Sequence, residues 1–294
     1  MVSWAKNKQA FTIVELLIVI VVIAILAAIT IVAYTGIQDR AKVSALVSDL
    51  QNNAKKVEIA KAETGTDVYP ATGAFSPQGS QGTTMSYEQK GNAFCLTATN
   101  SGTSYAITSG SSPTPGSCEV NLVKNPKGIG AVGNYNASGW FTPLGSTTDT
   151  ANVSWGGRSD WHRFVWSGSG NSIKRLYVDL AELTNGQTYT ASVVVANSGT
   201  ATVAFQFDFS DVNTTAFSIA PGEQRRVSVS AARSYDSTFR FIDLQLTSSN
   251  STGLLVTDAM LTRTTSLTSF GYGDTEGWAW TGTPGASVSI GPAE

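Results

Sequence analysis

The sequence predicts an α+β protein with one long N-terminal helix, a small β head and a larger all-β sandwich. The helix is indicated by an apolar run of about 23 residues, residues 11–33, that continues as an amphipathic helical pattern to position 65. Residues 66–120 hold two short strand patterns. Residues 121–294 alternate apolar and polar side chains, with turn residues between the runs. Only 14% of the residues are charged, while Gly, Ser and Thr are abundant, so further long helices are not expected.

The composition limits the classes of function and of metal site. The net charge is −2 and the pI is about 5.5, so the chain has no general electrostatic attraction for nucleic acid. Two cysteines and a single histidine cannot form an ordinary zinc site. Cys95 and Cys118 lie in a region rich in Gly, Ser and Thr. In an exported protein, a disulfide closing this loop stabilises by about 3 kcal/mol; the alternative is two separate buried thiols.

The N-terminal segment has a basic start followed by an apolar run that contains a single carboxylate, Glu15. The leader MVSWAKNKQA is basic through Lys6 and Lys8, which predicts a cytoplasmic N-terminus for the membrane-spanning run that follows. A secretory signal peptide has a shorter apolar run of about 7–15 residues. A plain signal anchor has the right length but leaves Glu15 without a role. The third alternative is cleavage between Ala10 and Phe11, which creates an α-amino group one helical turn from Glu15.

The segment FTIVELLIVIVVIAILAAI resembles the class III signal of type IV prepilins and of their relatives in secretion systems. In that family a short basic leader precedes a Phe and a Glu follows four residues later, as Phe11 and Glu15 do here. The resemblance implies that a prepilin peptidase removes residues 1–10 and methylates the new amine of Phe11. It also implies that Glu15 faces the Phe11 amine of a neighbouring subunit during assembly. The family usually has Gly before the cleavage point, where this chain has Ala10.

The helical pattern continues beyond the membrane-spanning run and predicts one pilin-type helix over residues 11–65, about 80 Å long. Gly36 is its only interior glycine, where we expect a bend or local loosening. Gly65 is the expected stop. The second half is amphipathic and must bury one face, whose apolar positions are Val43, Leu46, Val47, Leu50, Ala54 and Val57.

A small β head over residues 66–120 is the expected cover for that face. AFCLTATN and SYAITSG predict two short strands joined by SGT, and Cys118 would tie the end of the segment to the first strand. Residues 71–90 are rich in Gly, Ser, Gln and Pro, which predicts a variable loop. This layout resembles the pilin head, a small sheet on the upper half of the helix that is often closed by a disulfide.

Residues 121–294 predict a β-sandwich of about ten short strands. NLVKNP, GQTYTASVVV and LLVTDAML, in that order, resemble jelly-roll modules of the carbohydrate-binding type. The tail FGYGDTEGWAWTGTPGASVSIGP resembles short terminal segments of surface and phage-tail proteins, and no mechanism follows from it. The strand patterns are TYTASVVVANSG, TVAFQFDFS, RRVSVSA, FRFIDLQLTS and GLLVTDAMLTR.

Sugar sites stack exposed aromatic rings on the apolar faces of pyranoses. Trp140 and Trp155 lie beside glycines in predicted loops and are the candidates for ligand contact, whereas most other rings are expected in the core. Asp258 on the last strand is a ligand for a structural calcium or, more simply, an edge aspartate. A strand over residues 160–166 places His162, Phe164 and Trp166 on one face, and Trp161 and Arg163 on the other.

From the sequence, the protein is predicted not to be an enzyme and to have neither a cofactor nor a metal site. His162 is the only histidine and has no partnered nucleophile, and the familiar catalytic motifs are absent. A glycosidase works with two carboxylates alone, but scattered acids in a strand-rich domain are expected to be solvated. The acids concerned are Asp179, Glu182, Asp208 and Asp211.

These patterns together predict a minor or tip subunit of a type IV pilus-like filament that displays its sandwich for surface or glycan contact. The protein is expected first as a single-pass prepilin of the bacterial cytoplasmic membrane and then in a cell-surface filament. Its expected partners are a prepilin peptidase, other pilin subunits, the membrane and glycans, but no nucleic acid. Two alternatives stay open: a pseudopilin of a type II secretion or DNA-uptake machine, and a membrane-anchored carbohydrate-binding protein that does not polymerise.

Overall fold

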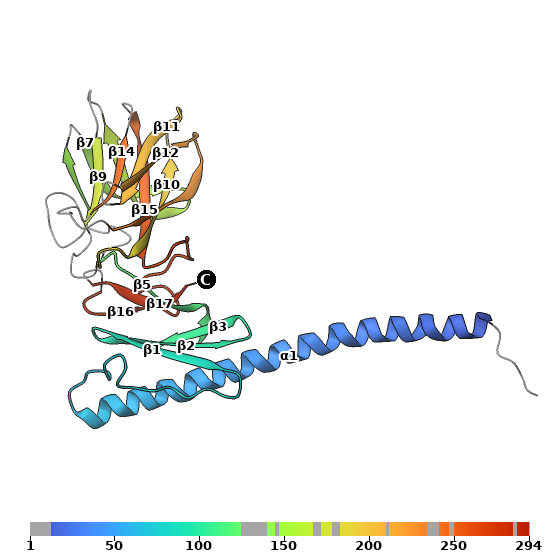
Figure 1. The fold of residues 1–294 in the computed structure, drawn as a ribbon. Coiled ribbons are helices and arrows are strands. Elements are labelled where there is room, and N and C mark those ends of the chain that lie inside the picture. The colour runs from blue at the N-terminus through green and yellow to red at the C-terminus, as the bar shows by residue number, and fades with distance from the viewer. Residues whose placement is uncertain are drawn as a thin grey trace, which may run out of the picture. The chain divides into compact units, whose positions relative to one another are not determined.

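The chain forms two compact units, Met1–Ala45 and Leu46–Glu294. One long helix is followed by antiparallel strands in four sheets, as the sequence predicts (Figure 1). The division into a leader, a helix, a head and a sandwich at positions 10, 65 and 120 stays a prediction. The computed structural model describes residues 13–124, 140–144, 147–166, 172–177, 183–209, 212–233, 241–246, 250–284 and 287–293.

Helix α1 (Ile13–Thr64) continues through Gly36 without a break (Figure 1). It ends where the chain meets Gly65, whose φ of +63° is a left-handed conformation that glycine adopts without strain. The Gly65 N–H donates to the Ala62 carbonyl and so satisfies one of the last carbonyls of the helix. The predicted stop at Gly65 is therefore confirmed.

The second half of α1 packs on the head sheet. Leu46, Leu50 and Val57, at helical spacing, are fully buried in the same core as Phe94 and Leu96. The two predicted head strands are confirmed and lie in the middle of the sheet. Its strands, in sheet order, are β1 (Thr84–Lys90), β2 (Ala93–Asn100), β3 (Thr103–Thr108) and β4 (Thr114–Pro115).

The expectation of a variable loop over residues 71–90 is wrong for its last part, because Thr84–Lys90 form β1 and pair with β2. The alternation of Met85 and Tyr87 with polar residues is a strand pattern, and both side chains pack against the head core. The preceding residues are also held in place: the Asn53 side chain of α1 donates to the Gln78 carbonyl at 2.8 Å and accepts from the Gln78 N–H at 3.0 Å.

The sandwich consists of two five-stranded antiparallel sheets, here named the β15 sheet and the β14 sheet after their central strands. All five strand patterns quoted from the sequence are confirmed, and so is the strand over residues 160–166. The β15 sheet runs in the order β13 (Gln224–Ala232), β10 (Thr188–Asn197), β15 (Asn250–Thr262), β8 (Arg158–Trp166), β7 (Thr147–Trp155). The β14 sheet runs in the order β12 (Val212–Ile219), β11 (Val203–Phe209), β14 (Phe241–Leu246), β9 (Ser172–Tyr177), β6 (Trp140–Leu144).

The core of the sandwich lies between these two sheets. Phe205, Phe207 and Phe209 of β11 point inward, as the period-two pattern predicts, and pack in one cluster with residues of the β15 sheet such as Tyr189 and Val193.

A fourth, three-stranded sheet is made from segments that are far apart in the sequence. Its order is β16 (Ala279–Trp280), β17 (Ser289–Ala293), β5 (Ser117–Asn121). The last described residues of the chain therefore pair with the strand that comes directly before the sandwich, and not with a strand of the sandwich itself.

Candidate functional sites

The first half of α1 presents apolar side chains on all sides. The large apolar side chains between Ile13 and Ile37 whose placement is described are 46–85% exposed. Such a surface is unfavourable in water, so it requires lipid or other helices around it. The helix is long and apolar enough to cross a membrane. The first half of α1 is therefore suited to anchor the protein in a membrane or to pack against other helices.

Glu15 lies in the first turn of α1 as the structure describes it, with its side chain exposed among the apolar side chains of Leu16, Ile18 and Val19. A single carboxylate within a bilayer costs about 3 kcal/mol on insertion scales, so its presence requires a compensating partner. The predicted cleavage point, Ala10 and Phe11, lies outside the described residues, and the role of all three residues stays a prediction.

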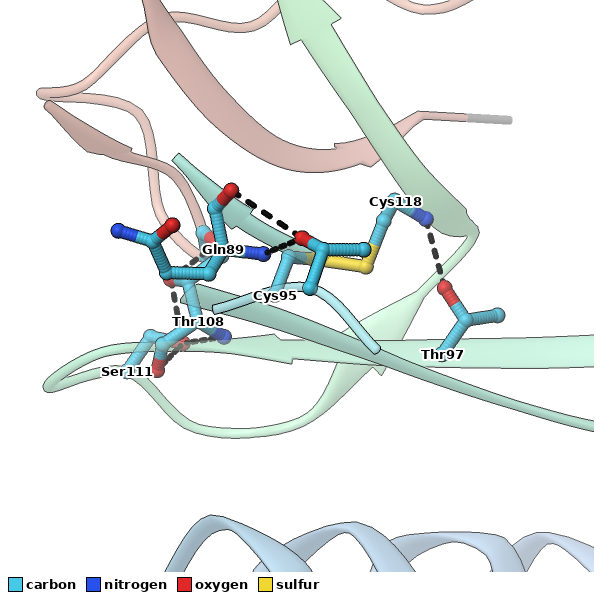
Figure 2. Close-up of a disulfide and its surroundings, with 8 residues drawn as sticks. Gln89, Cys95, Thr97, Thr108, Ser111 and Cys118 are labelled. Carbon is cyan, nitrogen blue, oxygen red and sulfur yellow. Dashed lines mark hydrogen bonds between the residues drawn. A yellow bond between two sulfur atoms is a disulfide. The ribbon is translucent and has the colours of Figure 1, made fainter. Parts of the chain in front are cut away.

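The predicted disulfide joins Cys95 of β2 to Cys118 of β5, with the two Cα atoms 5.9 Å apart (Figure 2). The backbone N–H of Cys118 also donates to Thr97 Oγ1 at 2.8 Å. The disulfide therefore binds β5 to the middle of the head sheet, at the position where the chain leaves the head for the sandwich.

The outward face of the β14 sheet carries two polar rows. Gln206 of β11 pairs with Gln245 of β14, and Asp208 pairs with Asp243. These residues alternate with the inward-facing apolar side chains of the same strands, so they face away from the core. The glutamines are partly exposed, whereas the aspartates are only 5% and 4% exposed. In the backbone register, Asp243 pairs with Arg175 of β9, which pairs with Phe141 of β6.

The expectation that the scattered acids are solvated is wrong for Asp208, because the residue lies in the middle of a sheet face and not at an edge or in a loop. Asp179, Glu182 and Asp211 lie outside the described residues. Gln206, Gln245 and Asp243 were not among the candidates predicted from the sequence. The signal that could have found them is the alternation itself, since QFDF and FIDLQL place polar side chains at every second position between buried ones.

The two candidate tryptophans lie in different sheets. Trp155, at the end of β7, is half-buried and packs edge-on against Trp161, with 5.9 Å between the ring centroids. Trp140 begins β6 and pairs in register with Leu176 of β9. Trp161 is fully buried and belongs to a separate small cluster that includes Val194 and Leu255, so it is a core residue as expected. Contact of Trp140 or Trp155 with a ligand stays a prediction.

Asp258 accepts hydrogen bonds from the side chains of two arginines. Arg158 Nη1 and Nη2 donate to its carboxylate at 2.8 and 2.9 Å, and the same arginine also binds Asp160. Hydrogen bonds to Asp160 and then to Asp258 raise the pKa of Arg158. Asp258 is not the edge residue that the sequence predicts, since β15 is the central strand of its sheet. Its φ of +52° reflects the irregular register that β15 has with its neighbour here.

A second arginine approaches the same residue through the backbone. Arg226 Nη1 donates to the Asp258 carbonyl and to Ser192 Oγ, both at 2.9 Å. Burial lowers the pKa of Arg226 to about 10.

The only histidine, His162, is buried in β8. Within the described ranges, no group of three or more His, Cys, Asp or Glu residues is placed to hold a metal ion.

Residues 5–31 match the family described as Prokaryotic N-terminal methylation motif, which confirms the resemblance to a prepilin-type signal. The matched segment includes Ala10, Phe11 and Glu15. A motif of this kind followed by a long apolar helix fits membrane anchoring and then a surface filament. None of the curated proteins matches the sequence.

Solved structures similar to this chain include carbohydrate-binding modules, the class that the sandwich sequence resembles. One is the two-module fragment of Clostridium thermocellum endo-1,4-beta-D-xylanase 10B, with 19% identity, TM-score 0.37, and coverage of 49% of this chain but only 28% of that chain. A second is a xylan-binding domain of family 22, with 13% identity, TM-score 0.36 and coverage of 50% and 97%. A third is the Paenibacillus barcinonensis xylan-binding domain, with 13% identity, TM-score 0.33 and coverage of 50% and 98%.

Proposed function

We propose that this protein is a subunit of a type IV pilus-like filament that is assembled through the first half of α1. The observation that supports this is the methylation motif over residues 5–31 on a helix whose first half exposes its large apolar side chains. In the membrane, lipid covers these side chains. In a filament, equivalent helices of neighbouring subunits cover them instead.

Cleavage before Phe11 gives Glu15 its role in this scheme. Hydrolysis of the Ala10–Phe11 peptide bond leaves a positive α-amino group on Phe11, and the Glu15 carboxylate of the next subunit pairs with it. In surroundings of low dielectric constant this attraction is strong, and a mismatched register leaves both charges without a partner. The pair therefore stabilises one register of incoming subunits over all others.

Two measurements test this function. Mass spectrometry of the membrane-bound protein is expected to find a mature chain that begins at methylated Phe11, and an intact Met1 contradicts the proposal. Glu15→Ala is expected to insert into membranes normally but to be depleted from sheared filaments. Glu63→Ala, an exposed acid at the other end of the same helix, is the matched control and is expected to assemble as the wild type does. Equal incorporation of both variants refutes the role of Glu15.

We further propose that the sandwich makes the surface or glycan contact of a minor or tip subunit. Two features support this. A β-sandwich after the head hinders close packing along a shaft, which favours a subunit that is rare or terminal. The partly exposed Gln206 and Gln245 also present amide donors and acceptors side by side on one sheet face, a chemistry suited to sugar hydroxyl groups.

A glycan array probed with the full chain in detergent micelles tests the contact. Gln206→Ala combined with Gln245→Ala is expected to abolish binding, while Gln224→Ala, an exposed glutamine of the other sheet, leaves it unchanged. Trp155→Ala tests whether the Trp155 ring, which the sequence predicts as a ligand contact, takes part in glycan binding. If the wild type binds no glycan, the proposed glycan contact is refuted, while the proposed filament function still stands. Binding that survives the double substitution moves the site away from these glutamines.

A further inference from the structure

The C-terminal segment over residues 270–284 and 287–293, which we name the latch, ends in β17, the strand that pairs with β5. The register of β17 with β5 pairs Ser289 with Asn121 and Ala293 with Ser117. In the sequence the sandwich lies between β5 and β16, the two outer strands of the sheet whose central strand is β17. The central strand β17 pairs with both of these outer strands.

The latch is bound to the hairpins of the head. The Asn92 N–H, in the turn between β1 and β2, donates to the Thr281 carbonyl at 2.7 Å, and Thr108 Oγ1 of β3 donates to the Gly277 carbonyl at 2.8 Å. The approach at the first of these turns requires a glycine. A Cβ on Gly91 would lie 1.9 Å from the Thr281 carbonyl oxygen, so any larger residue separates the two backbones.

The same segment is bound to the sandwich. The ring of Trp278 packs with Met260 of β15 and with Ala293 of β17. The Arg226 guanidinium, held by the central strand of the β15 sheet, lies 4.7 Å from the centroid of the Phe270 ring. The contacts with Met260 and Arg226 join the latch to the outward face of that sheet.

Asn121 closes the junction between head, latch and sandwich. Its buried side-chain amide donates to the carbonyls of Ala259 in β15 and of Gly271 in the latch. Its side-chain oxygen accepts from the N–H of Leu261. One side chain at the end of β5 thus satisfies backbone groups from both other parts, and a loss of the latch leaves buried polar atoms without their partners.

We infer that the latch couples the head and the sandwich into one cooperative unit and transmits tension between them. A pull on the sandwich acts on β5 at one connection and on β16 at the other, and β17 pairs with both. β5 is covalently bound to β2 by the Cys95–Cys118 disulfide, so the load passes into the head sheet and from there to α1. β5 in turn has its strand partner only when β17 is in place. This inference holds whatever the sandwich binds, so it goes beyond the proposed function.

Calorimetry and hydrogen exchange on the full chain in detergent micelles test the coupling. The wild type is expected to unfold β2 of the head and β10 of the sandwich in a single transition. Gly91→Ala, which drives a Cβ into the latch, is expected to split that transition in two and to speed exchange at β17 by at least about tenfold. Gly102→Ala is the matched control, because it has a similar positive φ in the next hairpin turn but open space around its Cβ.

Gly291→Ala tests the same coupling from the latch side, since its Cβ would lie 2.4 Å from the Trp278 ring. Two separate transitions in the wild type overturn the inference, as does a single unchanged transition in both latch variants. A split that appears equally in Gly102→Ala also overturns it, because strain in a head turn would then explain the result. The wild-type measurement decides the question even if a variant fails to fold.

Discussion

Leu50→Ala is expected to weaken the contact between α1 and the head sheet by an amount that the packing predicts. Leu50 is fully buried and shares one core cluster with Tyr87, Phe94 and Leu96. Truncation of a leucine in such a site removes the transfer free energy of its side chain and leaves a cavity, which together cost about 2–5 kcal/mol. At 1.36 kcal/mol per factor of ten, the opening equilibrium of the head rises by about 30-fold to several thousand-fold.

Hydrogen exchange at the amides of β2 measures this change directly, provided that exchange follows equilibrium opening. The full chain in detergent micelles is the sample, so the helix keeps an apolar environment. Ile59→Ala is the control: it lies on the same half of the helix, but its side chain is 57% exposed, so its effect is expected within about 0.5 kcal/mol. If Leu50→Ala and Ile59→Ala exchange at the same rate, packing on Leu50 does not hold the helix to the head.

Three further outcomes are expected. Replacing Cys95 and Cys118 with alanine removes the loop closure and lowers the free energy of unfolding in urea by about 3 kcal/mol; an unchanged midpoint contradicts this. Burial raises the pKa of Tyr87 to about 12, so only the unfolded chain loses this proton between pH 10 and 12. Stability measured by circular dichroism should therefore fall as pH rises through that range, and Tyr87→Phe should show a smaller decrease than the wild type. Asp258→Ala leaves the partly buried Arg158 with one carboxylate fewer and should cost about 1–3 kcal/mol, while a shift within about 0.5 kcal/mol in thermal unfolding argues against the pair.

Local periodicity was sufficient to predict the helix and most of the sandwich strands. The alternation in TVAFQFDFS and the amphipathic repeat beyond the membrane-spanning run depend on side chains that are close in the sequence, so they are visible without the fold. The disulfide was also predictable, because Cys95 and Cys118 are the only cysteines. Strand β1 was missed because Gly, Ser and Pro around it suggested a loop, although Met85 and Tyr87 alternate correctly.

What the sequence did not predict depends on pairing between distant segments. Asp258 was expected to be an edge aspartate, but the strand order places β15 in the centre of its sheet. Asp208 and Asp243 meet only because β11 pairs with β14. The latch is the clearest case, since neither residue composition nor periodicity in the tail indicates that β17 pairs with β5. Such pairings are set by the tertiary core and not by local pattern.

The distribution of the core explains how one chain can serve both a membrane and a filament. Within the described ranges, every hydrophobic core cluster is built from residues between Leu46 and Ala293, and none uses a side chain from the first half of α1. Moving that half-helix from lipid into a bundle of neighbouring helices therefore exchanges one apolar environment for another without removing a contact from the core. Under the proposed function, the free energy of assembly is set by the helix surface and by the proposed Glu15 pair, while the stability of the remainder is set separately. On this basis, a substitution such as Leu50→Ala should loosen the head without changing membrane insertion, and Glu15→Ala should impair assembly without changing the stability of the head.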